Sequence, residues 1–585
     1  MTLLSKTTIM LAGKPVSNFK EIRLHQKIHT HHILEARFPW QVFEEEAKKL
    51  GEKSKDFLGE TFSVQISTNF KKEKLGEHVF KGIVTGINII KGANTQTGDE
   101  IVLIAASQDI IADDGPNYSC FHEEQIGAIV KKTLEGFGFK LKVDSTASET
   151  INYVVQHNES AYQFIQRLSE QYGQWLYYNG EELVFGKPET KETELRYKFD
   201  LKDYKINLIP QSQKFEYFTQ DYLQNKVQKD GKPHKPDVSG NNATVYDKSN
   251  KIFKNSTNVW VNTNSEKGAK SILQHKAKVQ QESLAINQVR ITGNSENSNV
   301  VLGNIVKIEG IKYRVVQVNH FVNRSGHYEN KFEGVSASQE GYPHTNINAF
   351  PISQSQIAKV IDTNDPEGIG RIKVSFAWQD LIGETSPWIR VLTPSAGEGQ
   401  GIQFLPEVGD EVMVDFEGGD AESPYVIGAM YHKNKKPGGD WGSSGNDMKV
   451  IRTRGGHQIT FKDKGGDESI TIEDKEGNKI LLDTKNKEIS VTSSLKLNIT
   501  AGSDIDITAG GKLSLNAGTD LTIDAGTKLT CKAGTELSAA GGVKAELKAP
   551  QVGIKGDATA KLEGAIVDIN GSGMTNVKGG IVNLN

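Results

Sequence analysis

The chain has 585 residues, of which 24% are charged, and its net charge is -4, so no overall basic field indicates nucleic-acid binding. No apolar run approaches the roughly 20 residues that cross a bilayer, and the first twenty residues lack the long apolar segment of a signal peptide. The two cysteines, Cys120 and Cys531, are too few for a disulfide framework. We therefore expect several domains that fold in a reducing compartment.

Residues 1–345 show mixed β patterning with a few helices. The clearest helix follows Ser160, which has the spacing of a capping box with Gln163. Further helices are predicted near residues 122–136 and 265–283, and residues 300–337 have the pattern of three or four strands.

Residues 350–432 contain five predicted short strands separated by turn-forming sequences, which predicts an OB-type barrel. The predicted strands are 357–363, 370–378, 388–394, 411–417 and 425–431. Such barrels often bind oligonucleotides or sugars through basic, aromatic grooves. This segment is rich in Asp and Glu, so we expect no nucleic-acid binding. The glycines of residues 397–401 precede no helix and therefore do not form a phosphate loop. Residues 433–448, rich in glycine, form a linker with no room for a catalytic domain.

The tract 449–585 contains a repeat of eight residues, clearest from LNITAGSD through IDITAGGK and LTIDAGTK. Apolar and polar residues alternate within each octad, which is strand periodicity, and an even period keeps each apolar residue on the same face. Repeats of this kind form β-helices or β-prisms, with glycine at the corners. The predicted corner glycines and core leucines are Gly502, Gly510, Gly518, Gly526, Gly534, Gly542, Leu513, Leu521 and Leu529.

One octad has too little apolar surface to form a core. Two closures remain open: three octads of one chain wound as a solenoid, or three chains intertwined with one chain on each face. In either closure we expect Gly518 and Gly526 to have a positive φ or a sterically closed environment.

Residues with catalytic or metal-binding chemistry form no recognised pattern. His25, His29, His31 and His32 cross both faces of a strand, and we interpret them as a solvated strand end. His122 lacks the second histidine of a zinc-binding helix. The sequence contains no G-x-S-x-G motif, and no histidine follows His457. We expect a non-enzymatic assembly protein without cofactors or metals.

Three stretches resemble VgrG, the spike family of type VI secretion systems and a relative of contractile phage tail hubs. They are the barrel motifs DPEGIGRIKV (365–374) and FLPEVGDEVMVDF (404–416), the helix ESAYQFIQRLSEQYGQWLYY (159–178), and the octads. Glu407 stands where the family usually has arginine.

The resemblance implies a mainly β fold with a few helices. It comprises a phage-hub-like region of two barrel subdomains with helices (1–345), an OB-fold barrel (350–432), a linker (433–448) and an octad-repeat needle (449–585). The needle would be a triple-stranded β-helix formed by a homotrimer.

The same resemblance implies a machine component that is assembled in the cytoplasm and ejected without a signal peptide. Implied partners are an Hcp-like tube protein, baseplate proteins, effector cargo supplied as a separate protein, a mechanically punctured target membrane, and a PAAR-type tip protein. We expect the tip protein to bind Ile581, Val582, Asn583, Leu584 and Asn585. The alternatives are the hub-spike of an extracellular injection particle or phage tail and, on the repeat pattern alone, a β-helical polysaccharide-degrading enzyme.

Overall fold

The computed structural model describes residues 4–44, 51–70, 73–92, 98–230, 240–263, 268–442 and 444–584. The chain divides into two compact units. Unit 1 comprises Met1–Ile451 and Thr460–Ile470, and unit 2 comprises Arg452–Ile459 and Thr471–Asn585. Among the described residues, no helix is both long and apolar enough to cross a membrane.

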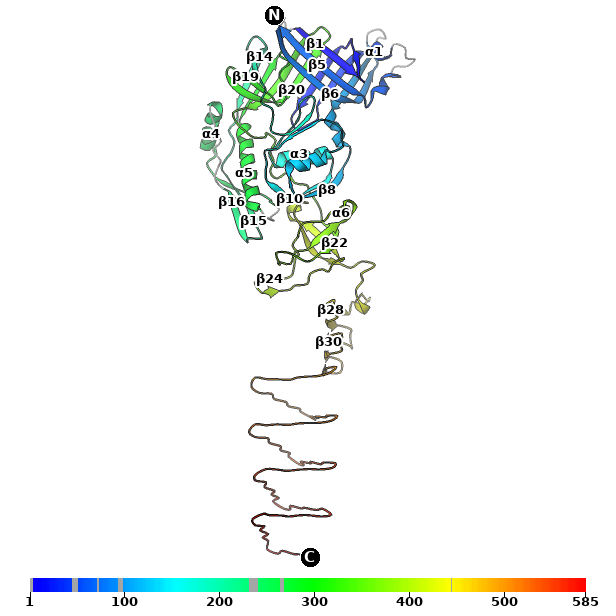
Figure 1. Cartoon of the computed structure of the whole chain (residues 1–585), viewed down its shortest axis with the longest axis vertical. Helices are drawn as coiled ribbons and strands as arrows, with labels where there is room; N and C mark the ends of the chain where they lie inside the picture. The colour runs from blue at the N-terminus through cyan, green and yellow to red at the C-terminus, as the bar shows by residue number, and fades with distance from the viewer. Residues whose placement is uncertain are drawn as a thin grey trace. The chain divides into compact units, whose positions relative to one another are not determined.

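The described part of unit 1 contains a 13-stranded sheet with the path β14-β18-β21-β20-β3-β4-β7-β6-β5-β1-β2, to which β19 and β13 are attached (Figure 1). Its strands are β1 (Leu4–Leu11), β2 (Lys14–Val16), β3 (Glu21–Lys27), β4 (Ile33–Pro39), β5 (Thr61–Phe70), β6 (Glu73–Ile90), β7 (Glu100–Ser107), β13 (Glu192–Leu195), β14 (Leu201–Leu208), β18 (Val289–Ser295), β19 (Ile305–Ile308), β20 (Ile311–Asn323) and β21 (Tyr328–Ser336). Because β20 is long, it pairs with β3, β19 and β21 and joins the N-terminal strands to those after residue 289.

Two hydrophobic cores form along this one sheet. The first contains Phe38, Phe62 and Phe80, and the second contains Tyr313 and Phe332. Both cores consist mostly of alternate strand residues, as expected for sheets with one covered face. The predicted strand content of residues 300–337 is confirmed as β19, β20 and β21.

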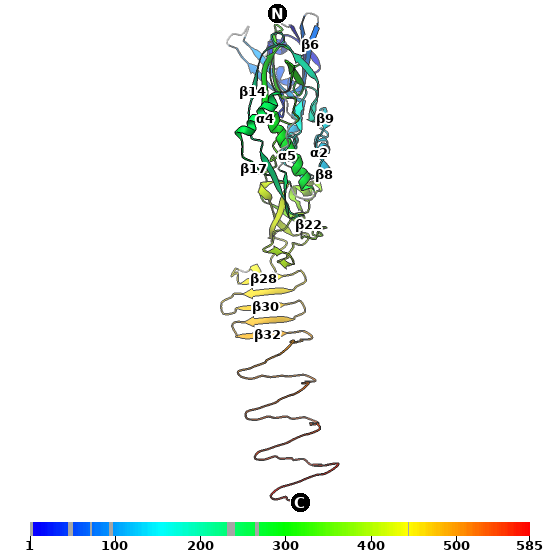
Figure 2. The same ribbon diagram turned by 90° about the vertical axis from the view of Figure 1, so that its left-hand side faces the viewer.

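Smaller sheets and the helices complete the region that we call the hub region (residues 4–345). The helices α4 and α5 lie on the same side of unit 1 in Figure 2. The elements are α1 (Gln41–Glu44), η1 (Ser54–Phe57), η2 (Gln108–Asp113), β8 (Asn117–Gln125), α2 (Ile126–Thr133), β9 (Leu141–Asp144), β10 (Thr150–Glu159), α3 (Ala161–Gln171), β11 (Trp175–Tyr178), β12 (Leu183–Gly186), β15 (Phe215–Asp221), β16 (Lys226–Asp230), α4 (Gly240–Ile252), β17 (Thr257–Trp260) and α5 (Ala269–Ile286).

The helix predicted after Ser160 is confirmed as α3, and its capping box with Gln163 is present. The helix predicted at 122–136 is shorter than expected, because residues up to Gln125 belong to β8, which pairs with β10. The helix predicted near 265–283 is α5, whose expected first residues, 265–267, lie outside the described residues.

The interpretation of the histidine cluster as a solvated strand end agrees with His25, which is exposed, but is wrong for His29 and His32. His32 is completely buried and His29 nearly so. The turn after β3 packs against the hub interior, where His29 N–H donates to the Leu176 carbonyl. The His29 Nε2 atom lies 2.6 Å from Glu170 Oε1, and burial lowers the pKa of His32 to about 4. His29 and His32 are therefore structural groups of the hub interior.

The barrel region (residues 350–432) has a four-stranded sheet of order β23-β22-β26-β27 in the described chain. Its elements are β22 (Gln356–Asp362), β23 (Lys373–Phe376), α6 (Ala377–Ile382), β24 (Ala396–Gly397), β25 (Gln400–Gly401), β26 (Glu411–Phe416), η3 (Glu417–Gly419) and β27 (Pro424–Met430).

The expected strand at Trp388–Val391 is not continuous. It makes only the isolated pairings Ile372–Ile389 and Val391–Val426. Prolines at 387 and 394 flank this segment, and proline has no N–H with which to extend a ladder.

Asp365 organises the turn between β22 and β23. Its carboxylate accepts hydrogen bonds from the main-chain amides of Glu367, Ile369 and Arg371 and from the Arg371 guanidinium at 2.8 and 3.0 Å. Although burial acts in the opposite direction, these hydrogen bonds, led by the one from Arg371, lower the pKa of Asp365 to about 2.

The linker and the start of the tract contain η4 (Gly439–Gly442), β28 (Met448–Arg452), β29 (Gln458–Lys462), β30 (Ser469–Glu473), β31 (Lys479–Asp483) and β32 (Glu488–Thr492). The linker begins against the barrel, since Lys435 Nζ lies 2.7 Å from Asp410 Oδ1. In unit 2, β31 and β32 pair as an antiparallel hairpin.

Beyond Thr492 the described chain follows an open serpentine course without hydrogen-bonded strands (Figures 1 and 2). It bends at each of the predicted corner glycines, every eight residues from Gly502 to Gly542. Of the two alternatives expected for Gly518 and Gly526, the positive φ is not present, and the sterically closed environment in an assembled needle stays a prediction. Neither has a positive φ, and a Cβ at either would meet no atom within 4 Å, because no second layer of chain lies beside the corner.

Candidate functional site

The hub and barrel regions meet within unit 1 at a junction of buried ionic groups. Arg167 of α3 lies at its centre. The Arg167 guanidinium donates to Glu159 at 2.8 Å, to Glu422 of the barrel at 3.0 Å, and to the Val155 carbonyl at 2.6 Å. The side chains of Arg167 and Glu422 are only 8% and 6% exposed.

The local sequence explains why Arg167 lies there. The capping box fixes the first turn of α3 at Ser160, and the apolar residues Phe164 and Leu168 anchor the helix in the hub core. The guanidinium lies over the Phe164 ring at 5.3 Å. Burial disfavours the charged form, but Glu422 and Glu159 outweigh this effect and raise the pKa of Arg167. Arg167 is therefore a fixed positive charge that binds the barrel.

Two further buried charged residues, Lys276 and Asp420, lie beside the first pair and are linked through Asn262. Lys276 of α5 donates to the Asn262 carbonyl at 3.1 Å, and Asn262 Nδ2 donates to Asp420 of the barrel at 2.9 Å. Burial lowers the pKa of Lys276, whereas burial and the neighbouring Glu422 raise the pKa of Asp420. Both side chains are 4% exposed, so they link hub and barrel away from solvent.

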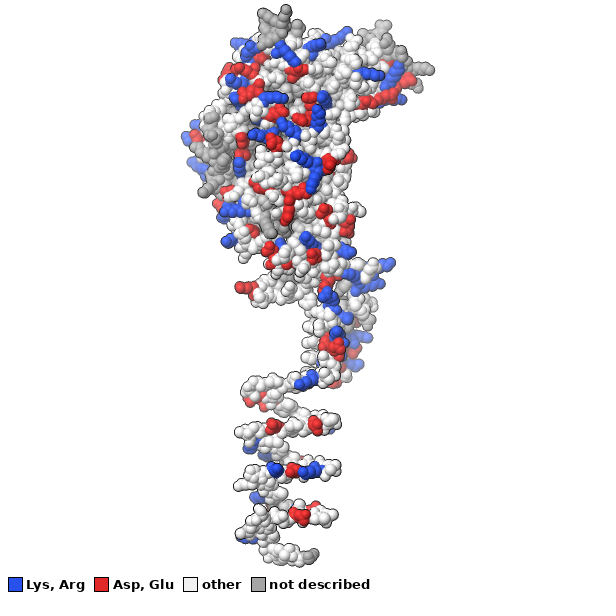
Figure 3. Space-filling model, viewed as in Figure 1, with Lys and Arg blue, Asp and Glu red and all other residues white. Residues whose placement is uncertain are grey.

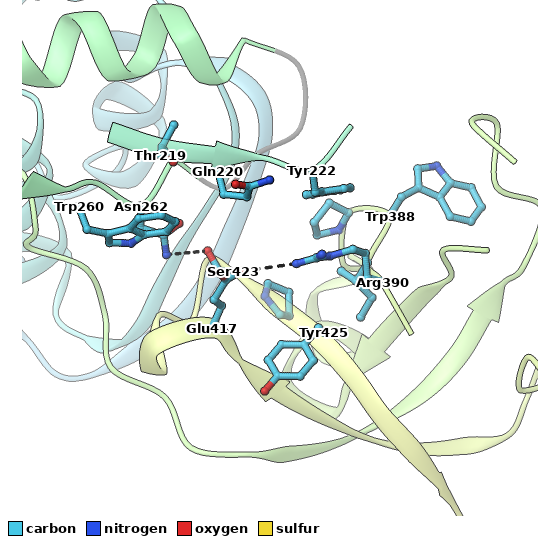
Figure 4. A pocket seen from close by; sticks show the side chains of 13 residues that line it. Thr219, Gln220, Tyr222, Trp260, Asn262, Trp388, Arg390, Glu417, Ser423 and Tyr425 are labelled. Atoms are coloured by element: carbon cyan, nitrogen blue, oxygen red, sulfur yellow. Dashed lines mark hydrogen bonds and ion pairs between the residues drawn. The ribbon is translucent and has the colours of Figure 1, made fainter. Parts of the chain in front are cut away.

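Figure 4 shows a shallow pocket at the edge of this junction. Arg390 lies 4.5 Å from the Tyr222 ring centroid and 3.7 Å from Glu417, and Asn262 donates to Ser423 at 3.0 Å. The pocket presents the hydroxyl groups of Thr219 and Ser423 together with the Glu417 carboxylate, which is paired with Arg390. The residues that line it are Thr219, Gln220, Tyr222, Trp260, Asn262, Pro387, Trp388, Ile389, Arg390, Glu417, Ser423, Pro424 and Tyr425. The pocket therefore lies between residues of the hub region and residues of the barrel region.

Charged side chains on unit 1 are mixed in sign. On the face drawn in Figure 3, basic and acidic residues are interspersed, and the octad tract carries few of either. This distribution on the visible face resembles an ordinary solvated surface and not the basic stripe of a nucleic-acid-binding protein.

The predicted needle and tip residues are all on the surface of the single chain. Leu513, Leu521 and Leu529 are 55–59% exposed. At the predicted tip, Ile581, Val582 and Leu584 are also exposed, as is Asn583, whereas Asn585 lies outside the described residues. The structure therefore brings the apolar residues to a regular stripe without covering them, and an apolar stripe of this length indicates an interaction surface.

Sequence reasoning identified the motifs around Arg167 and Glu422 but not their pairing. The partners lie 255 residues apart, and a single sequence contains no signal that links them. An arginine inside an otherwise well-formed amphipathic helix is the one local sign that a buried carboxylate faces it.

Comparison with known proteins assigns both regions. Residues 47–327 match the phage tail baseplate hub (GPD) family, and residues 356–431 match the type VI secretion system/phage-baseplate injector OB domain. The type VI secretion system spike protein VgrG1b of Pseudomonas aeruginosa is 29% identical over 198 residues, which cover 32% of this chain and 26% of that protein. The actin cross-linking toxin VgrG1 of Vibrio cholerae is 28% identical over 161 residues, which cover 25% of this chain and 14% of that protein.

The aligned segments thus span about a quarter of the first relative and less of the second. Among solved structures, a chain of the Francisella PdpA–VgrG complex in its half-lidded form has a TM-score of 0.52 at 10% identity, covering 84% of this chain and 88% of that chain. This likeness concerns the fold. Together the matches confirm the resemblance to VgrG spike proteins, with hub and injector OB domains in consecutive segments of one chain.

Proposed function

We propose that this chain, a relative of the VgrG spike proteins, is the hub-and-spike component of a type VI secretion machine. The observation that carries the proposal is the succession of a baseplate hub domain, an injector OB domain and an octad tract in one chain. The buried junction supports a mechanical role, since a thrust applied to the hub would pass to the barrel through Arg167 and Glu422.

The spike would be a homotrimer whose three octad tracts wind into one needle. The exposed leucine stripe and the unpaired strand backbone of residues 495–584 support this closure, because both require neighbours that one chain lacks. If each face stacks three chains at about 4.7 Å, 24 residues advance the needle by roughly 14 Å.

The partners follow from this role. The trimeric hub would sit on a ring of an Hcp-like tube protein within the baseplate, and a PAAR-type protein would bind residues 581–585, of which 581–584 are exposed. Effector cargo would travel on the spike, and sheath contraction would drive it through a target membrane. The spike would assemble in the cytoplasm and leave the cell with the machine, and the chain would have no catalytic activity of its own.

The second candidate is the hub-spike of an extracellular injection particle or phage tail. The injector OB family includes phage baseplates as well as type VI systems, which favours keeping this alternative.

Two measurements test the proposal. Light scattering on the full chain should give three times the chain mass of 64.3 kDa, and a monomer with an intact needle would contradict it. In the bacterium that encodes the chain, deletion of its gene should stop release of the tube protein, and the wild-type gene should restore it. Recovery of large free particles from the culture medium would instead assign the chain to an extracellular particle.

Tip binding is tested by removing residues 578–585 while the trimer stays folded. The truncated spike should no longer retain the tip protein in a pull-down. Undiminished retention would place the tip protein elsewhere.

A further inference from the structure

Three side chains with metal-binding chemistry meet where the hub faces the barrel. Cys120 and His122 lie on β8, and Glu384 follows α6 of the barrel region. Alternate residues of a strand point to the same face, so Cys120 and His122 project together. Cys120 Sγ lies 3.9 Å from His122 Nε2, which lies 3.8 Å from Glu384 Oε2. Among the described residues, this is the one group of His, Cys, Asp and Glu side chains whose ligand atoms all lie within 4.8 Å of one another.

We propose that Cys120, His122 and Glu384 form a Zn²⁺ site that fastens the hub to the barrel, with the fourth coordination position left to water. Zinc accepts thiolate sulfur, imidazole nitrogen and carboxylate oxygen in tetrahedral sites. Ideal zinc bond lengths place sulfur and nitrogen about 3.6 Å apart and nitrogen and oxygen about 3.4 Å apart. The observed separations exceed these values by only a few tenths of an ångström.

Movement of exposed side chains can shorten these separations between the ligand atoms. The Glu384 side chain is 47% exposed, whereas Cys120 is nearly buried against Tyr153 and Val155. A small rotation of Glu384 therefore brings its carboxylate closer to His122, and a small rotation of the half-buried His122 side chain brings Nε2 closer to Cys120 Sγ. The exposed side of His122 and Glu384 leaves a path for the ion and for its water ligand.

Neighbouring groups hold the ligands in orientation. Gln379 is completely buried, and its Oε1 accepts the Phe376 main-chain N–H at 3.2 Å. This contact fixes the amide so that Nε2 donates to Cys120 Sγ at 3.5 Å, as expected beside a metal-bound thiolate. The His122 imidazole also hydrogen-bonds the Thr385 main chain, a second contact of the kind that orients metal-binding histidines.

Binding exchanges one proton for the metal. The Cys120 thiol gives up its proton to solvent as the sulfur–zinc bond forms, and no oxidant or reductant is needed. The site joins Cys120 and His122 of the hub region to Glu384 of the barrel region, so bound zinc stabilises the hub–barrel contact only when both domains are folded.

Cobalt provides a direct probe of this site. The full-length chain, freed of any affinity tag and stripped with a chelator, is titrated with Co²⁺ and then with Zn²⁺. We expect one Co²⁺ per chain, a thiolate-to-cobalt charge-transfer band, the strong visible absorption of four-coordinate cobalt, and loss of both when zinc is added.

The two cysteines supply a matched pair of variants. Cys120→Ser should abolish the charge-transfer band, whereas Cys531→Ser, which alters an exposed cysteine of unit 2, should keep it unchanged. His122→Gln and Glu384→Gln retain the thiol and should weaken Co²⁺ binding at least about 10-fold, with circular dichroism confirming the fold. Zinc should raise the melting temperature of the hub–barrel unit in the wild type but not in Glu384→Gln.

Cobalt binding without a thiolate band, a band lost in Cys531→Ser but kept in Cys120→Ser, or equal affinity in the wild type and Glu384→Gln would overturn the proposal.

Discussion

Unit 1 and the octad tract of unit 2 follow the same alternation of apolar and polar residues, with opposite results. In unit 1 the apolar faces cover one another, and residues such as Val360 and Phe332 are completely buried. In the octads the corresponding leucines stay more than half exposed, although the chain bends at every predicted corner. The difference shows that a strand pattern specifies a face, while the partner of that face can belong to the same chain or to another copy.

The largest expected effect tests whether other copies of the chain cover the apolar face of the octad tract. Leu521→Asp should abolish needle assembly, because three carboxylates would meet on a dry axis, whereas unit 1 should melt as in the wild type. Limited proteolysis should then cleave within residues 495–584. Thr522→Asp is the matched control, since it places the same charge one position along, on the opposite face. A protease-resistant needle in the Leu521→Asp protein would show that the register is wrong.

The second-largest expected effect concerns unit 1, in which the apolar faces are covered within one chain. Arg167→Ala should destabilise unit 1 by about 3–5 kcal/mol, because Glu422 would remain buried without its partner. Urea unfolding of the full chain measures this. Lys81→Ala, which breaks the exposed ion pair with Glu181, should cost less than about 1 kcal/mol. Equal losses in the two variants would contradict the assigned role of the junction.

Glycine substitutions sharpen the comparison between the units. Gly303 has a φ of +82°, and a Cβ there would lie 2.4 Å from the buried Tyr177 ring, so Gly303→Ala should cost about 2–4 kcal/mol in unit 1. Gly526 has open space around it within one chain. Gly526→Val should therefore cost more than about 1 kcal/mol per chain only in the assembled needle, where neighbouring chains crowd the corner.

Thermal melting of both variants at high and low protein concentration distinguishes a cost within one chain from a cost that appears only in the assembled needle. A large cost of Gly526→Val in dissociated chains would disagree with the open corner.

The smallest effect is on the pH dependence of the barrel. The pKa of Asp365 is about 2 in the folded state, below its ordinary value of 3.8. The stabilisation of the folded state by this carboxylate is therefore complete above pH 3.8 and is lost as the pH falls toward 2. We expect Asp365→Asn to remove about 2 kcal/mol at pH 7 and little at pH 2. The difference between wild-type and variant unfolding free energies at the two pH values measures it. A pH-independent difference would mean that the carboxylate charge is not what holds the turn.

The sequence was most informative where signals are local. The capping box at Ser160, the strands of residues 300–337 and the glycine bends all depend on neighbouring residues, and the structure confirms them. The helix near 122–136 and the strand near 388–391 were misjudged because pairing with β10 and the flanking prolines decided the outcome. Propensity is weaker than tertiary contact in both places.

The junction and the cysteine site were beyond a single sequence for a different reason. Arg167 and Glu422, like Cys120 and Glu384, come from separate domains whose contact depends on how whole domains pack. The Cys-x-His spacing on one strand was a usable sign, but two ligands without a third do not specify a metal. His32 was misjudged because it packs against Tyr178 of β11, which follows more than a hundred residues later.

The regular bends every eight residues also have a genetic consequence. Gain or loss of eight codons would lengthen or shorten the shaft while every later leucine kept its side, whereas a single-codon insertion would turn them all outward. The length of the octad tract can therefore change in evolution by whole repeats, independently of unit 1, in which the 13-stranded sheet joins strands from distant parts of the sequence.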